Sequence, residues 1–102
     1  MLLAEFSITP LDKGASVSPW VSASLDIVDR SGLPYRLGAM GTCVEGEWDE
    51  VMGLVKACLE RMTADCDRVS ITLRGDWRRG ASGRLTAKIA KVEATLGRKL
   101  KT

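Results

Sequence analysis

The chain contains no histidine, and this absence limits the chemistry open to it. Histidine is the most common general base near neutral pH and the most common metal ligand in proteins. Without it, a serine or cysteine nucleophile has no imidazole partner within the chain, and a zinc site would have to use thiolates and carboxylates alone. We therefore expect no metal and no cofactor, and an enzyme ranks last among the candidate functions.

Cysteine is scarce as well, and its pattern excludes a disulfide framework. The chain has three cysteines, Cys43, Cys58 and Cys66, which is an odd number, and no two of them form a C-x-x-C motif. The sequence predicts a core position for Cys58, a turn for Cys66 and a strand for Cys43. None has a neighbouring base that would convert it to a reactive thiolate.

Long apolar runs are also missing. No run reaches the roughly 20 residues that span a bilayer, and the first residues lack a basic segment and meet an acid at Glu5, unlike a signal peptide. We therefore expect a cytoplasmic protein that does not enter membranes. With 102 residues, 45% of them hydrophobic and 27% charged, the chain is predicted to form one domain over residues 1–102.

The net charge of +2 is unevenly distributed. Residues 1–68 hold 6 basic and 11 acidic side chains, whereas residues 69–102 hold 9 and 2. This asymmetry is compatible with a solvated helix or with pairing of two copies, which we favour, and also with an anionic partner such as nucleic acid. Contacts to nucleic acid would come from the basic side chains Arg74, Arg78, Arg79, Arg84, Lys88 and Lys91.

Extended segments are predicted where apolar and polar residues alternate. Residues 2–9 and 68–74 show this pattern, which is typical of strands with one buried face. Residues 35–37 and 42–45 are also expected to be extended. The glycines between them, Gly38 and Gly41, could form a bulge in one bent strand or the turn of a hairpin.

Three further segments carry apolar residues at steps of three and four, the pattern of amphipathic helices. They run from a serine cap at Ser16 or Ser18 to Ser31, from Glu47 to Met62 and from Leu85 to Leu96. Trp20 and Trp48 fall on these apolar stripes and are expected in the core. The glycine- and arginine-rich residues 75–83 are predicted to form a mobile loop, in which Trp77 would cover an interface or stack on a nucleobase.

This order of elements predicts an α+β fold, a ferredoxin-like βαββαβ antiparallel sheet with helices on one face and an added C-terminal helix. The apolar side of that last helix needs a partner, which could be another subunit. In this topology residues 2–9 and 68–74 lie side by side at the centre of the sheet. The uncovered face would then gather four hydroxyl side chains, here termed the hydroxyl quartet: Ser7, Thr9, Ser70 and Thr72.

Two interpretations of these positions stay open. Hydroxyls suit a solvated strand, but they also provide directional hydrogen bonds in a half-buried ligand or subunit surface, with Glu5, Glu45 and Arg74 at its rim. Met40-Gly41-Thr42 is a second candidate, because glycine admits a ligand close to the backbone and methionine offers an adaptable wall.

The residues that carry these features resemble a known family. The most specific stretch is Ser31-Gly32-Leu33-Pro34-Tyr35-Arg36-Leu37-Gly38-Ala39-Met40-Gly41-Thr42, continued through Val44-Glu45-Gly46-Glu47-Trp48-Asp49-Glu50-Val51, and it is flanked by Phe6-Ser7-Ile8-Thr9-Pro10-Leu11 and Arg68-Val69-Ser70-Ile71-Thr72-Leu73. Over residues 2–97 the chain resembles the thiamine-binding protein family, which is related to the YkoF thiamine-binding proteins. The resemblance implies a ferredoxin-like fold, homo-oligomers that are commonly tetramers built from dimers, and non-catalytic binding of thiamine or its hydroxymethylpyrimidine part.

The resemblance also implies where the ligand would bind. Hydroxyls would bind the pyrimidine edge, Glu45 or Glu5 would balance the thiazolium charge, and Met40 would cover a ring. The last strand departs from the regular Thr-Ile-Lys-Ile-Asp run of other members, so the loop that follows it, and the ligand, could differ here. The expected ligand-binding residues are Ser7, Thr9, Met40, Gly41, Thr42, Glu45, Ser70 and Thr72.

Overall fold

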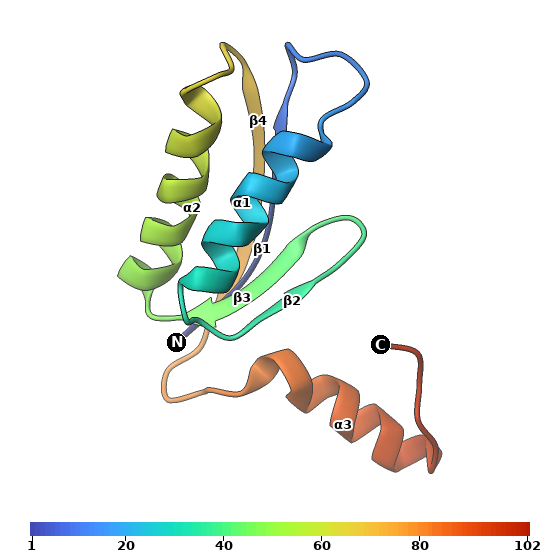
Figure 1. The fold of residues 1–102 in the computed structure, drawn as a ribbon. Helices are drawn as coiled ribbons and strands as arrows, with labels where there is room; N and C mark the ends of the chain where they lie inside the picture. The colour runs from blue at the N-terminus through green and yellow to red at the C-terminus, as the bar shows by residue number, and fades with distance from the viewer.

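The computed structural model describes all residues, 1–102, and has the predicted order of elements. The strands are β1 (Leu2–Pro10), β2 (Tyr35–Leu37), β3 (Thr42–Gly46) and β4 (Val69–Trp77), and the helices are α1 (Ser18–Arg30), α2 (Trp48–Thr63) and α3 (Arg84–Leu96). The strands form one antiparallel sheet in the order β2-β3-β1-β4. Helices α1 and α2 cover one face, and α3 lies apart from them (Figure 1). The fold is the expected ferredoxin-like α+β fold.

Strand β1 forms the centre of the sheet and alternates between a buried and a partly exposed face along its whole length. Its buried residues, among them Phe6 and Ile8, pack against the two helices. The other side of the sheet, which α1 and α2 leave uncovered, is here termed the open face. Strand β4 pairs with β1 as predicted, but it lies at the edge of the sheet. The central position expected for residues 68–74 was therefore wrong.

The glycines between β2 and β3 form the turn of a hairpin, so the interpretation as a bulge was wrong. The amide of Gly38 donates a hydrogen bond of 2.9 Å to the carbonyl of Gly41. A Cβ atom on Gly38 would lie only 2.8 Å from that same oxygen, so only glycine fits this close approach. Tyr35 holds the start of the hairpin against α1, because its hydroxyl donates a 2.7 Å hydrogen bond to Asp29.

Helix α2 supplies most of the helical part of the core. It starts with a capping box in which Glu47 and Glu50 satisfy each other's backbone amides, and Cys58 and Met62 are fully buried. Trp48, expected in the core, is 58% exposed because it lies in the first turn, beyond the edge of the sheet. At the start of α1 no serine side chain caps the helix, and Pro19 in the first turn supplies the helix start instead.

Helix α3 projects from the rest of the molecule and is anchored at its N-terminal end. It packs mainly on β3, and none of its residues is buried. Arg84 at its start also bonds to Asp76 of β4 and to the carbonyl of Met1. The radius of gyration is 15.1 Å, whereas a compact domain of this length would have about 13 Å. The segment before α3 was predicted to be a loop from Gly75 onward, but β4 continues to Trp77. The Trp77 side chain is 53% exposed, and the guanidinium of Arg79 lies 5.3 Å from its ring centroid.

Candidate functional site

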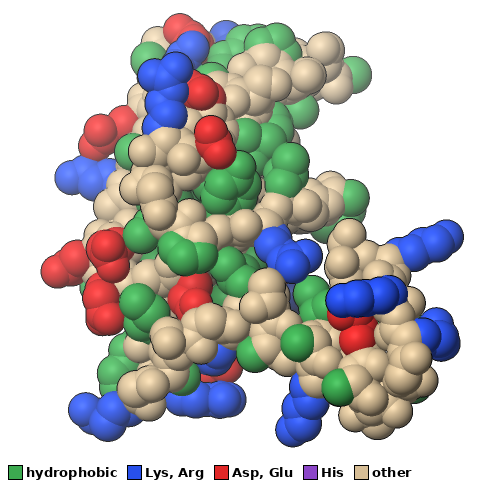
Figure 2. Space-filling model, turned by 60° about the horizontal axis from the view of Figure 1, so that its bottom comes forward, with side chains coloured by type: hydrophobic (Ala, Val, Ile, Leu, Met, Phe, Trp, Pro, Cys, Tyr) green, Lys and Arg blue, Asp and Glu red, His purple; other side chains and the backbone are tan.

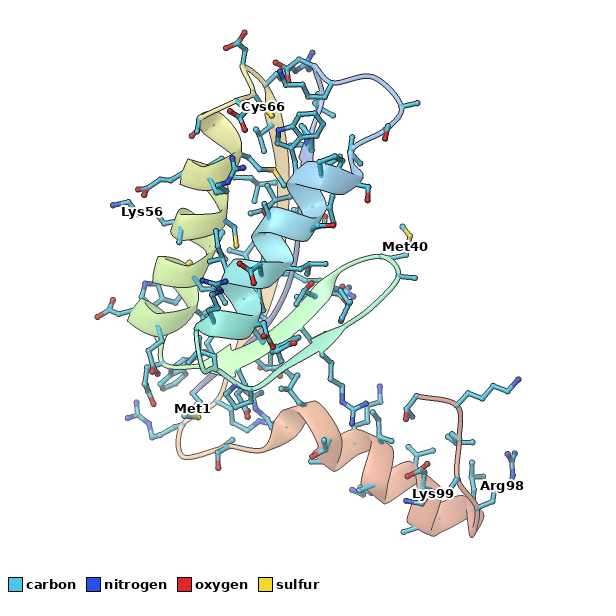
Figure 3. All side chains as sticks on the ribbon, viewed as in Figure 1. Met1, Met40, Lys56, Cys66, Arg98 and Lys99 are labelled. Carbon is cyan, nitrogen blue, oxygen red and sulfur yellow. The ribbon has the colours of Figure 1, made fainter.

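An uncharged cavity lies between α1, the end of β1 and the β2–β3 turn, and is here termed the hairpin cavity. Its volume is about 340 Å³, and none of its 14 lining residues is charged. Met40, Gly41 and Thr42, all predicted ligand-binding residues, border it from the turn. Figure 3 shows Met40 at the tip of the hairpin, where its side chain is 90% exposed. The cavity is within the size range of small-molecule sites.

Two hydroxyl groups border this cavity without a protein partner. Ser24, on the buried face of α1, is only 6% exposed, and its Oγ atom is buried without a hydrogen bond. Thr42 is 5% exposed overall, and its hydroxyl makes no hydrogen bond to the protein, but its Oγ1 atom, unlike Oγ of Ser24, is not fully buried. A buried hydroxyl without a partner lowers the stability of the folded state. These two groups are therefore free to bond a polar ligand.

The edge of β1 adds a backbone donor and acceptor to the same cavity. Pairing between β1 and β3 ends at Phe6 and Thr42. In an antiparallel ladder, alternate residues direct their peptide groups to opposite neighbours, and Leu11 bonds to Arg68 on the β4 side. Ile8, three residues before Leu11, therefore directs its N–H and C=O toward β3, where it has no partner. It borders the cavity and is 7% exposed.

The hydroxyl quartet is brought together on the open face, as expected, and only its two β1 members border the hairpin cavity. Ser7 lies opposite Thr72, and Thr9 lies opposite Ser70. Because Phe6 and Ile8 face the helices, alternation directs the quartet's side chains to the open face. Ser7 and Thr9 border the hairpin cavity through their place on the β1 edge, whereas Ser70 and Thr72 do not reach it.

The two carboxylates expected near a ligand cation already have partners. Glu45 is 3% exposed and accepts hydrogen bonds from the amides of Gly83 and Arg84, at 2.8 and 3.2 Å. It also lies 3.6 Å from the guanidinium of Arg84. Glu5 accepts a hydrogen bond of 2.9 Å from Arg74 on the open face. Glu45 thus anchors α3, and neither carboxylate borders the hairpin cavity.

The thiols show no sign of activation. Burial raises the pKa of Cys43, and the Glu5 carboxylate beside it raises it further. Burial also raises the pKa of Cys58 and of Cys66. A raised pKa keeps a thiol protonated at neutral pH, which makes it a poor nucleophile.

Two further features bear on the class of site. No group of three or more cysteine, aspartate or glutamate side chains is placed to hold a metal ion. None of the helices combines the length and the apolar character needed to cross a bilayer.

Sequence reasoning missed Ser24 and Ile8. Ser24 carried a recognisable signal, since it interrupts the apolar stripe of α1 between Val21 and Val28. Ile8 carried none, because its free peptide group depends on where the hairpin turns.

Comparison with known proteins agrees with this fold. The sequence profile of the thiamine-binding protein family matches residues 4–93. A UPF0045 protein of Mycobacterium tuberculosis is 41% identical over 96 residues, which cover 93% of this chain and 94% of the relative. A UPF0045 protein of Methanocaldococcus jannaschii is 34% identical over 91 residues, covering 89% and 91%.

Solved structures extend the same likeness. A crystal structure of a hypothetical protein from Methanocaldococcus jannaschii has a TM-score of 0.76 at 33% identity and covers 94% of this chain and 95% of its own. A candidate thiamine biosynthesis and salvage protein of Thermotoga maritima has a TM-score of 0.78, covering 89% and 97%, and at 21% identity it supports the fold alone. With a family match across most of its length and these relatives, the chain belongs to the thiamine-binding protein family.

Proposed function

We propose that the protein binds thiamine or its hydroxymethylpyrimidine part in the hairpin cavity, without catalysis and in the cytoplasm. The observation that carries this proposal is the uncharged cavity with free polar groups on two sides, Ser24 on α1 and the Ile8 peptide on β1. An aminopyrimidine presents an N–H donor beside a ring-nitrogen acceptor. The Ile8 C=O and N–H form the complementary pair, and Ser24 and Thr42 can bond the remaining polar atoms.

The same cavity favours recognition of the pyrimidine over recognition of the thiazolium. The pyrimidine is neutral, and the lining contains no carboxylate that could balance a cation. Glu5 and Glu45 are engaged by Arg74 and Arg84. The thiazolium would therefore point out of the cavity past the hairpin tip, where Met40 can cover it.

Calorimetry with thiamine and with hydroxymethylpyrimidine tests the proposal. We expect both to bind, with affinities within about tenfold of each other, a difference of about 1.4 kcal/mol. Ser24→Ala and Thr42→Val should each weaken binding by about 1–3 kcal/mol, because each removes one ligand partner. In the free protein, Ser24→Ala should leave the melting temperature unchanged or raise it, since it removes a buried hydroxyl without a partner.

The matched controls are Ser70→Ala and Thr72→Val, which remove open-face hydroxyls that do not border the hairpin cavity. These variants should keep the affinity of the unmodified protein. If they weaken binding while Ser24→Ala does not, the ligand lies on the open face and the hairpin cavity is excluded. No heat and no thermal shift at millimolar ligand would refute the proposal as a whole.

We also propose that the protein acts as a homo-oligomer, a dimer or a tetramer. The support is surface that one chain leaves uncovered: the free edge of β4, with Ile71 42% and Leu73 38% exposed, and the last turn of α3, where Leu96 is 50% exposed. An uncovered strand edge and an apolar helix side both favour association. Analytical ultracentrifugation should give at least twice the mass of 11.1 kDa, and Ile71→Lys on the edge strand should lower it. A monomer at high micromolar concentration would contradict this proposal.

Nucleic-acid binding is supported less well. Of the six basic residues considered for it, Arg74 pairs with Glu5, and Arg84 is held within the fold by Glu45 and Asp76. The remaining ones lie on two separate elements, the start of the β4–α3 connection and α3 itself.

A further inference from the structure

A second cavity lies between α3, the last residues of the chain and the open face of the sheet, and is here termed the α3 cavity. Its volume is about 660 Å³. Figure 2 shows the hollow between the projecting α3 and the main body, with basic side chains at its edges. It lies on the open-face side, whereas the hairpin cavity lies on the α1 side, and no residue of α1 borders it. The two cavities share only the hairpin residues Leu37, Gly38 and Gly41.

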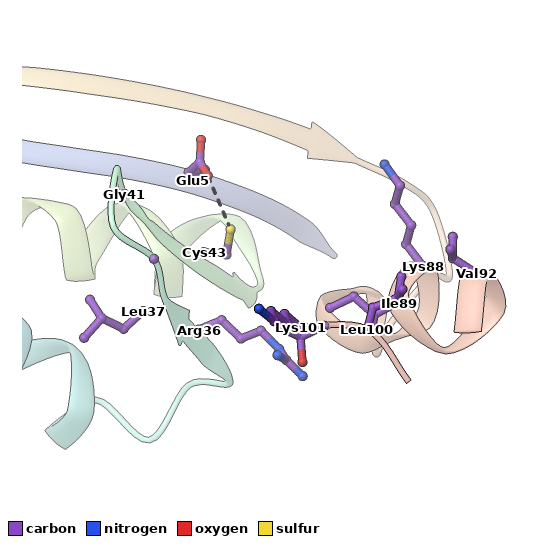
Figure 4. A pocket seen from close by; sticks show the side chains of 12 residues that line it. Glu5, Arg36, Leu37, Gly41, Cys43, Lys88, Ile89, Val92, Leu100 and Lys101 are labelled. Carbon is purple, nitrogen blue, oxygen red and sulfur yellow. Dashed lines mark hydrogen bonds between the residues drawn. The ribbon is translucent and has the colours of Figure 1, made fainter. Parts of the chain in front are cut away.

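Apolar side chains form one part of its wall. Ile89 and Val92 face it from successive turns of α3, and Leu100 faces it from the segment after the helix (Figure 4). Ile89 and Leu100 are partly buried, and Val92 is 36% exposed. These residues offer an apolar surface on which the body of an organic molecule can be buried.

Basic side chains form the rest. Arg36 from β2, Lys88 from α3 and Lys101 near the end of the chain all border the cavity, and none of them forms an ion pair. In Figure 4 Arg36 and Lys101 are drawn on one side of the cavity, whereas Lys88 extends from α3 away from them. The one acidic side chain on the wall, Glu5, is occupied by Arg74 at 2.9 Å. The free charge around the cavity is therefore positive.

We propose that the α3 cavity binds an amphipathic organic anion, a small molecule with an apolar or aromatic body and a phosphate or carboxylate group. The body would lie against Ile89, Val92 and Leu100, and the anion would lie beside one or more of the cations Arg36, Lys88 and Lys101. A concave surface that combines apolar side chains with separate cations favours a small amphipathic anion over an extended polyanion. A cation such as a thiazolium would be repelled here, so this site has the opposite charge preference to the one expected of a thiamine site.

Phenyl phosphate is a suitable probe, because it joins an aromatic ring to a phosphate. We expect its titration to shift the methyl NMR signals of Ile89 and Val92. Benzyl alcohol, which has the ring without the anion, and inorganic phosphate, which has the anion without the ring, should each bind at least about tenfold more weakly. Raising the salt concentration should weaken the binding of phenyl phosphate, because the cations are exposed to solvent.

Arg36→Gln combined with Lys88→Gln removes two of the three cations. An ion pair with an exposed cation contributes up to about fivefold in affinity. The double variant should therefore bind phenyl phosphate about tenfold more weakly. The matched control is Lys91→Gln, which removes an exposed cation from the same helix outside the cavity and should bind normally. Circular dichroism of each variant checks that the fold is retained.

Three results would overturn the proposal: benzyl alcohol binding as tightly as phenyl phosphate, unchanged affinity in the double variant, or no shift of the α3 methyl signals. If a second copy of the chain fills this cavity in the oligomer, phenyl phosphate will produce no shift, which also excludes the site. Binding of hydroxymethylpyrimidine is a separate measurement on the other side of the sheet, so failure at one site does not imply failure at the other.

Discussion

Replacing Glu45 with alanine should lower the free energy of unfolding by about 3 kcal/mol, the low end of the range for removing one partner of a buried ion pair. The carboxylate is almost fully buried and accepts two amide hydrogen bonds at the start of α3. The Arg84 side chain, 10% exposed, would lose it as a counterion. Arg84 keeps Asp76 at 3.0 Å and the carbonyls of Met1 and Asp76, which limits the loss.

Urea unfolding measures this change, and hydrogen exchange locates it. Because α3 packs mainly on β3 and has no buried residue, its amides should lose protection first, whereas those of β1 should retain it. Glu60→Ala is the matched control, since Glu60 is 66% exposed and pairs with Lys56 at 3.9 Å. It should cost less than about 0.5 kcal/mol. Equal losses in the two variants would show that Glu45 does not anchor α3.

Replacing Met62 with alanine should lower the free energy of unfolding by about 3 kcal/mol or more, within the range for truncating a buried methionine. Met62 is fully buried near the end of α2, in the cluster that includes Val28 and Val55. The truncation leaves a cavity that the surrounding strands and helices can only partly close. This loss is a large fraction of the 5–15 kcal/mol that stabilises a typical domain.

Met40→Ala makes the same chemical change at the exposed tip of the hairpin, where 90% of the side chain is accessible. It should change the free energy of unfolding by less than about 0.5 kcal/mol. Thermal and urea unfolding of both variants provide the comparison. A similar loss in the two variants would contradict the burial described for Met62.

The fold could be predicted because local patterns and topology agree. Strict alternation in β1, the acidic start of α2 and the glycine after α3 each specify an element independently of the rest. Positions that depend on the neighbours of an element were harder to predict. Trp48 continues an apolar stripe, yet the sheet does not extend beneath it. Residues 75–77 contain a glycine that suggests a loop, yet they pair with the start of β1.

The candidate site was predicted in part for the same reason. The turn residues Met40, Gly41 and Thr42 carry a local sequence signal, and they do border the hairpin cavity. The hydroxyl quartet follows from strand alternation and is assembled on the open face, as expected. The orientation of Glu45 toward α3 depends on a contact with residues 38 and 39 positions later in the chain. Alternation places Glu45 on the open face but does not identify its partner.

The place where the hairpin turns determines how much of β1 is left unpaired. Strand β3 begins at Thr42, so its ladder with β1 ends one hydrogen-bonded pair before Ile8. If β3 began two residues earlier, the residue opposite Ile8 would pair with that peptide and fill the space that the cavity now occupies. A ligand that bonds to Ile8 would take the place of the next residues of β3. The length of the β2–β3 segment can be read from the sequence of any relative. A short segment leaves the β1 edge free for a small molecule, whereas in a longer one the backbone of the chain itself occupies that edge.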